Sequence, residues 1–212
     1  MELNKKIVMD MCSDRKCPER TVHFGKTERL KMAEKQLSLS IVEINEIIKL
    51  TNDFIKTYGL EVYSGNNIIK AEQNPELTED FLKNFNKKVT KKYKGLKSKK
   101  DIIWMKFTKC KRLGVVACSN DINFDIPKSK EEYDEPKKIV DGKIKQWKYN
   151  TSGIIVDSQG LEWDKSFVLV FPLIGLKEGR EGTKQRHELE TGIGNYLIEN
   201  KVPIVDYYSH RI

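Results

Sequence analysis

Apolar and polar positions follow a clear order along residues 166–210. The apolar run Phe167–Leu176 is followed by Lys177–Thr183, which is charged and rich in glycine, and Val202–Val205 is a second short apolar run. Between them, apolar residues recur every four positions, as on one face of a helix: Leu189, Ile193 and Leu197. This order predicts a strand, a loop, a helix and a second strand, with the polar chemistry in the loop and the first helical turn.

The first part of the chain shows mainly helical spacing. Lys6–Met11 is a short apolar run and is predicted to be a strand. Glu28–Tyr58 repeats its apolar residues at helical spacing in two pieces, and Ser40–Glu43 has the capping-box pattern expected where the second piece begins. Gly59 is predicted to end that helix, because glycine adopts the left-handed backbone of a C-cap at low cost. Leu60–Tyr63 is predicted to be a short strand.

A second long helix is predicted over residues 76–95. Asn74 and Pro75 provide a favourable helix start, because proline fits the first helical position without losing a hydrogen bond. The apolar residues of this segment recur every four positions: Phe81, Phe85 and Val89. Lysines lie mostly off this stripe, so the helix is expected to have a basic outer face that runs into a basic loop.

From residue 101 the apolar spacing is typical of strands. Residues 101–110 and 113–119 flank Lys111 and Arg112, which predicts an antiparallel hairpin. Asn123–Asp141 is polar, contains two prolines and is predicted to be a loop or flap. Lys143–Tyr149 and Gly153–Val156 are each predicted to be a strand.

Together these elements predict a single domain of the α/β (or α+β) class with a mixed sheet. The C-terminal part is expected to be a β-loop-α-β unit and the middle an antiparallel hairpin region, with two long helices packed on the sheet. The domain is expected to span residues 1–212, and its two long helices residues 40–58 and 76–95. The basic helix and loop occupy residues 75–100, and the hairpin-rich region occupies residues 101–157. The β-loop-α-β unit occupies residues 166–208.

The net charge of +8 comes from one segment. Between Phe81 and Lys100 there are nine lysines and no acidic residue, and the rest of the chain has 30 basic and 31 acidic residues. Lysines can neutralise phosphates without reading sequence, so this segment indicates non-specific contact with nucleic acid. The other interpretation is a solvated helix face.

No segment has the pattern of a membrane span or a secretion signal. The longest apolar run has ten residues, well short of the roughly 20 that span a bilayer, and the first residues lack an apolar signal core. A cytoplasmic protein without a membrane partner is therefore expected. The cysteines, at Cys12, Cys17, Cys110 and Cys118, lack the C-x2-C spacing of a structural zinc site, which leaves both reduced thiols and a four-thiolate site open.

The densest group of chemically active residues is the segment 186–194. His187 and Glu190 are three positions apart, so they are neighbours on one face of a helix. A carboxylate after a strand end is typical of the crevice where open α/β sheets bind ligands. Gly192 and Gly194 are poor helix formers, which indicates close approach either by packed neighbours or by a ligand. Dipole complementation and surface charge are the other interpretation of these polar residues.

Glu190-x-Gly192 lies in a predicted helix, after the strand Phe167–Phe171 and before Lys201-Val-Pro-Ile204. This layout resembles the C-terminal part of the nucleoside 2-deoxyribosyltransferase family, and TIR-like NAD hydrolases show a related layout. In the transferases, the helical glutamate is the nucleophile on the anomeric carbon of the sugar. In TIR enzymes a helical glutamate serves cleavage of the nicotinamide–ribose bond. The resemblance implies a catalytic role for Glu190, with Gly192 as its packing companion.

The leading hypothesis is a protein that acts on a nucleoside or nucleotide at its N-glycosidic bond. Glu190 would stabilise or trap the oxocarbenium-like sugar, and His187 would protonate the leaving base. Arg186, Gly192 and Tyr207 are predicted to contact the substrate. No cofactor and no metal are expected.

Two other classes stay open. A nucleic-acid-binding protein or nuclease would use the basic segment, above all four of its lysines: Lys87, Lys88, Lys91 and Lys92. A non-enzymatic interaction protein of a phage or mobile element is the third class. The pattern determines neither the substrate nor the oligomeric state.

Overall fold

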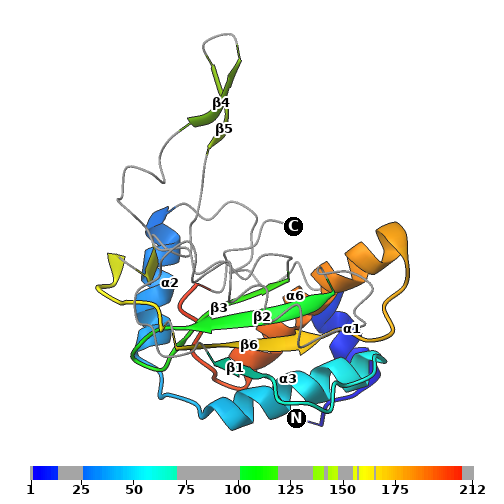
Figure 1. Ribbon diagram of the computed structural model, residues 1–212. Coiled ribbons are helices and arrows are strands. Elements are labelled where there is room, and N and C mark those ends of the chain that lie inside the picture. Colours follow the sequence, from blue (N-terminus) through cyan, green and yellow to red (C-terminus); the bar gives the residue numbers. More distant parts are fainter. Residues whose placement is uncertain are drawn as a thin grey trace.

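The computed structural model describes residues 2–13, 26–70, 101–118, 136–140, 143–147, 155–156, 158–164 and 166–206 (Figure 1). Its helices are α1 (Lys5–Ser13), α2 (Lys26–Leu37), α3 (Ile44–Tyr58) and α6 (Gly179–Glu199). Its strands are β1 (Ile68–Lys70), β2 (Ile102–Phe107), β3 (Leu113–Cys118), β4 (Pro136–Val140), β5 (Lys143–Trp147) and β6 (Phe167–Pro172). The predicted helix 76–95 and the lysine segment lie outside the described residues.

A four-stranded sheet in the order β1-β6-β2-β3 forms the centre of the molecule, and all its strand pairs are antiparallel. The predicted hairpin is confirmed as β2 and β3, with Trp104 opposite Ala117. The chain reverses near Lys111, whose φ of 62° supplies the left-handed residue of the turn. β6 pairs with β2 in the middle of the sheet and confirms the strand predicted at the start of the apolar run Phe167–Leu176.

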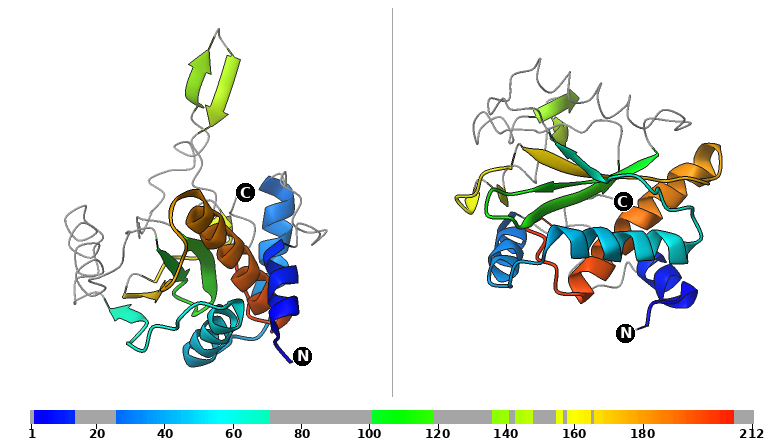
Figure 2. Two further views of the ribbon diagram at one scale, coloured as in Figure 1. Left: turned by 90° about the vertical axis from the view of Figure 1, so that its right-hand side faces the viewer. Right: turned by 60° about the horizontal axis from the view of Figure 1, so that its bottom comes forward.

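Alternate residues of each strand point to opposite sides of the sheet, and both sides are buried in a hydrophobic core. On one face lies a core that α1, α3 and α6 cover (Figure 2), and the strands contribute to it Ile103, Met105, Phe107, Leu113, Val116, Leu169 and Phe171. On the other face lies a second core with Ala33 of α2, to which the strands contribute Ile69, Ile102, Trp104, Val115, Ala117, Val168 and Val170. Burial on two faces explains why β2 and β6 are almost continuously apolar in sequence.

The helices predicted over Glu28–Tyr58 are confirmed as α2 and α3. α3 places Ile47, Phe54 and Ile55 in the core. Gly59 ends the helix as predicted, with a left-handed φ of 109°. The predicted capping box does not form, because the N-cap is Glu43 itself and no side chain caps the helix there.

The prediction of a strand at Lys6–Met11 is wrong, because this segment lies within helix α1. Val8, Met11 and Cys12 are buried together, at the spacing of one helical face. The backbone carbonyl of Met11 accepts a hydrogen bond of 2.7 Å from Asn195 Nδ2, which joins α1 to α6.

The C-terminal unit keeps its predicted order, but its parts have different lengths. α6 begins at Gly179, so five of the seven residues of the predicted loop Lys177–Thr183 are helical. The predicted strand Val202–Val205 is reduced to one parallel bridge, between Ile204 and Leu113 of β3.

Three smaller predictions also need correction. Leu60–Tyr63 contributes only a bridge from Glu61 to Ile174, and the strand of this region is β1. Pro136–Val140 was expected within a loop, yet it forms β4 and pairs with the predicted strand β5; the two stand apart from the main sheet (Figure 1). Ile155 and Val156 are helical rather than extended, with both side chains buried.

The α/β class predicted from the sequence is confirmed, with helices packed on a four-stranded antiparallel sheet. Parallel pairing is limited, in the described part of the chain, to the bridge at Ile204. None of the helices among the described residues has both the length and the apolar character needed to cross a bilayer.

Candidate functional site

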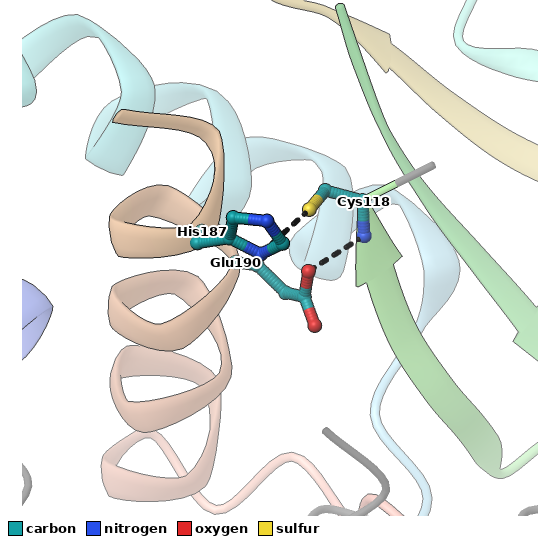
Figure 3. Close-up of side chains that lie close together, drawn as sticks. All are labelled: Cys118, His187 and Glu190. Atoms are coloured by element: carbon teal, nitrogen blue, oxygen red, sulfur yellow. Dashed lines mark hydrogen bonds between the residues drawn. The ribbon is translucent and has the colours of Figure 1, made fainter. Parts of the chain in front are cut away.

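Three side chains meet where the end of β3 faces the middle of α6: Cys118, His187 and Glu190 (Figure 3). One sulfur, nitrogen or oxygen atom from each lies within 4.8 Å of the corresponding atoms of the other two. Cys118 Sγ is 3.6 Å from His187 Nδ1, and the backbone N–H of Cys118 donates a hydrogen bond of 2.9 Å to Glu190 Oε2. The cluster therefore combines a thiol, an imidazole and a carboxylate at one place.

Packing of α6 on the sheet positions this cluster. Leu189, Ile193 and Leu197, the predicted apolar face, are fully buried against the core. His187 and Glu190 are three positions apart and lie on one side of the helix, as the sequence predicts. They occupy its middle rather than its first turn, because α6 begins earlier than expected.

The two helical members of the cluster differ in exposure. Glu190 is only 6% exposed, whereas His187 is exposed. The hydrogen bond from Cys118 fixes one oxygen of the Glu190 carboxylate toward β3. An oriented, largely desolvated carboxylate beside a solvent-facing imidazole is an arrangement suited to acid–base chemistry.

Cys118 is not set up as a nucleophile. Burial raises the pKa of its thiol well above the usual range, and the neighbouring negative charge of Glu190 raises this pKa further. The positive charge of Arg186 opposes this increase without cancelling it. Reactive cysteines have lowered pKa values, so the carboxylate and the imidazole are the groups here that fit catalysis at neutral pH.

Arg186 is predicted to bind substrate, and the structure places its guanidinium in an ion pair. Its Nη1 lies 3.2 Å from Asp101 Oδ1, and the two side chains are 12% and 15% exposed. Its Nη2 also donates a hydrogen bond of 3.4 Å to Thr183 Oγ1. In this arrangement Arg186 anchors α6 to the residue just before β2.

Gly192 lies in the tight contact between α6 and the neighbouring helices. A methyl group at this position would be 2.5 Å from Phe54 Cζ and 2.6 Å from Cys12 Sγ. Of the two reasons for close approach considered from the sequence, this contact supports packing.

Other predicted site residues lie outside the described part of the chain. These are Tyr207 and the basic segment with Lys87, Lys88, Lys91 and Lys92, so the nucleic-acid hypothesis stays a prediction.

The sequence indicated Cys118 only as a possible ligand of a four-thiolate site, and its place beside His187 and Glu190 was not predicted. Cys118 lies at the end of an apolar strand, and nothing in the sequence shows which helix that strand end faces.

Comparison of the chain with protein-family models, curated proteins and solved structures gives no match.

Proposed function

We propose that the protein acts on a nucleoside or nucleotide at its N-glycosidic bond, with Glu190 as the carboxylate and His187 as the proton donor. The observation that supports this function most directly is their placement in one cluster, where a buried and oriented carboxylate lies beside an exposed imidazole. The resemblance described above motivates the same role for Glu190.

The chemistry requires one negative group and one acid. When the bond between the anomeric carbon and the base breaks, its electron pair goes to the base nitrogen and positive charge develops on the sugar. The Glu190 carboxylate would stabilise that charge or form a glycosyl ester with it. His187 would give a proton to the leaving base, and a water or a second base would then complete the reaction.

The low exposure of Glu190 favours such a role. Charge interactions are stronger in a desolvated site than in water, so a carboxylate fixed by the Cys118 N–H can stabilise a cationic sugar without first reorganising solvent. His187 lies on the solvent side of the cluster, where a departing base would be released.

The test is base release by purified protein, incubated with NAD and with a panel of nucleosides and nucleotides. Free nicotinamide or nucleobase is followed by chromatography. Glu190→Gln removes the negative charge but keeps the shape of the side chain, and is expected to lower the rate by at least about 100-fold.

Glu188→Gln is the matched control, since Glu188 lies on the same helix but bonds to Tyr58 and Lys184 instead of Cys118. It should keep a rate within about threefold of the wild type, a span that corresponds to less than 1 kcal/mol. No release from any substrate, or equal rates for Glu190→Gln and wild type, would overturn the proposal.

A further inference from the structure

We infer that Cys118, His187 and Glu190 form a binding site for Zn²⁺ or a chemically similar divalent ion, with three protein ligands and a fourth position open to solvent. This inference goes beyond the proposed function and does not depend on it. It arises from the same cluster (Figure 3), because sulfur, imidazole nitrogen and carboxylate oxygen are the three atom types that bind zinc in proteins.

The spacing of the ligand atoms fits a tetrahedral ion. Zinc lies about 2.3 Å from a thiolate sulfur and about 2.0–2.1 Å from an imidazole nitrogen, so a tetrahedral angle separates the two ligand atoms by about 3.6 Å. Cys118 Sγ and His187 Nδ1 are 3.6 Å apart. The Glu190 oxygen is no more than 4.8 Å from either atom, so it lies near the third corner of the same tetrahedron.

The supporting structure is already in place around these ligands. His187 and Glu190 project from one side of α6, whose apolar face is fully buried, so the backbone that carries them is held by the core. The hydrogen bond from the Cys118 N–H orients the Glu190 carboxylate, as outer-shell hydrogen bonds do at metal sites. Binding an ion therefore requires no rearrangement of the fold.

The ligand set selects the kind of ion. Thiolate and imidazole favour zinc, cobalt and similar ions, whereas magnesium and calcium prefer a shell of oxygen atoms. When the ion binds, the Cys118 thiol releases its proton to solvent, and the resulting thiolate and the Glu190 carboxylate together balance the charge of the divalent cation. Because His187 is exposed, the fourth position faces solvent and can hold a water molecule or an added ligand.

The test is a titration of metal-free, reduced protein with Co²⁺, which binds zinc sites and reports its ligands by absorption. We expect one equivalent of Co²⁺ to give the near-ultraviolet charge-transfer band of a thiolate ligand and the strong visible bands of tetrahedral cobalt, both removed by one equivalent of Zn²⁺. Cys118→Ala should abolish the charge-transfer band. His187→Ala should weaken binding by more than about 100-fold, because loss of an outer-shell partner alone costs about 10- to 100-fold.

Cys110→Ala is the matched control, because Cys110 is a second partly exposed thiol that lies outside the cluster, next to Thr108. It should keep the full charge-transfer band. His187 is exposed, so its substitution should leave the circular dichroism spectrum unchanged and any lost affinity can be assigned to the ligand.

Two results would overturn the inference: no thiolate band at micromolar Co²⁺, or a band that survives Cys118→Ala. Neither readout uses an enzymatic substrate. Failure of the base-release assay would therefore overturn only the proposed function, and failure of the metal titration would overturn only the metal site.

Discussion

The hydroxyl of Tyr58 donates a hydrogen bond of 3.1 Å to Glu188 Oε2 and so joins the last residue of α3 to α6. Burial raises the pKa of Tyr58 well above its usual value, and the hydrogen bond to Glu188 and the charge of that carboxylate raise it further. The bond therefore joins the two helices close to the candidate site, two residues from Glu190.

Replacing Tyr58 with phenylalanine is expected to lower the free energy of unfolding by about 1–2 kcal/mol. The phenol ring remains packed, but a partly buried hydrogen bond to a charged group is lost. Urea denaturation at pH 7 measures this difference. A change below about 0.3 kcal/mol would show that the contact adds nothing to stability.

The raised pKa of Tyr58 predicts that the stability of the folded protein depends on pH in the alkaline range. An unfolded tyrosine loses its proton near pH 10, while the raised pKa keeps Tyr58 protonated in the folded state. Above pH 10 the folded state thus binds more protons than the unfolded state, and stability falls as the pH rises. The stability difference between wild type and Tyr58→Phe should be constant below about pH 9 and should shrink above pH 10. A difference that grows above pH 10 would contradict this assignment.

Gly192→Ala is expected to destabilise the protein although alanine is the better helix former. The helical preference gains about 1 kcal/mol, whereas the new methyl group overlaps Phe54, which is fully buried and cannot move aside. Overpacking of this kind costs about 1–3 kcal/mol, so we expect a net loss of up to about 2 kcal/mol. Lys184→Ala, at an exposed position of the same helix, should change stability by less than about 0.5 kcal/mol. Thermal unfolding compares the two, and an increase in Tm for Gly192→Ala would be incompatible with the packing described.

Asp101→Asn should cost more stability than the corresponding change in an exposed ion pair. Asp101 and Arg186 are 15% and 12% exposed, so loss of the carboxylate leaves a guanidinium without its counter-charge and costs about 2 kcal/mol. Glu162 and Lys109 are 70% and 63% exposed, and Glu162→Gln should cost less than about 1 kcal/mol. Both values come from urea titration, and equal losses would contradict the importance of burial for the Arg186 pair.

Zinc is expected to inhibit base release. An ion bound to the cluster would withdraw the Glu190 carboxylate and the His187 imidazole from acid–base chemistry, and a chelator should restore the rate. Cys118→Ala should need at least about tenfold more zinc for half-inhibition, because one ligand is missing. Identical zinc sensitivity of this variant and wild type would place the inhibitory ion elsewhere.

The spacing of apolar residues correctly predicted those helices and strands in which it fits a single type of secondary structure. α3 has a single apolar face, and its end at Gly59 follows from the backbone freedom of glycine. The β2–β3 hairpin follows from two apolar runs around a short polar turn. For α6, three apolar residues spaced by four identified the helix, although not its first residue.

The errors occurred where a short pattern fits two structures. Lys6–Met11 is too short for its apolar residues to distinguish a strand from a helix, and packing against α6 decides for the helix. Val202–Val205 has strand-like composition, but its pairing with β3 is limited to a single parallel bridge at Ile204. Two of the three residues of the candidate site were predictable, because His187 and Glu190 are local neighbours on one helix. Cys118 joins them only through the order of strands in the sheet.

The parallel bridge at Ile204 has a consequence for how copies of the chain behave toward one another. β3 is the last strand on its side of the described sheet, and its outer backbone groups would be a template for pairing with another molecule. The N–H groups of Val205 and Asp206 donate to the carbonyls of Leu113 and Gly114, at 2.8 and 2.9 Å. The segment that follows α6 thus shields the first half of this edge, and its removal would favour self-association through β3.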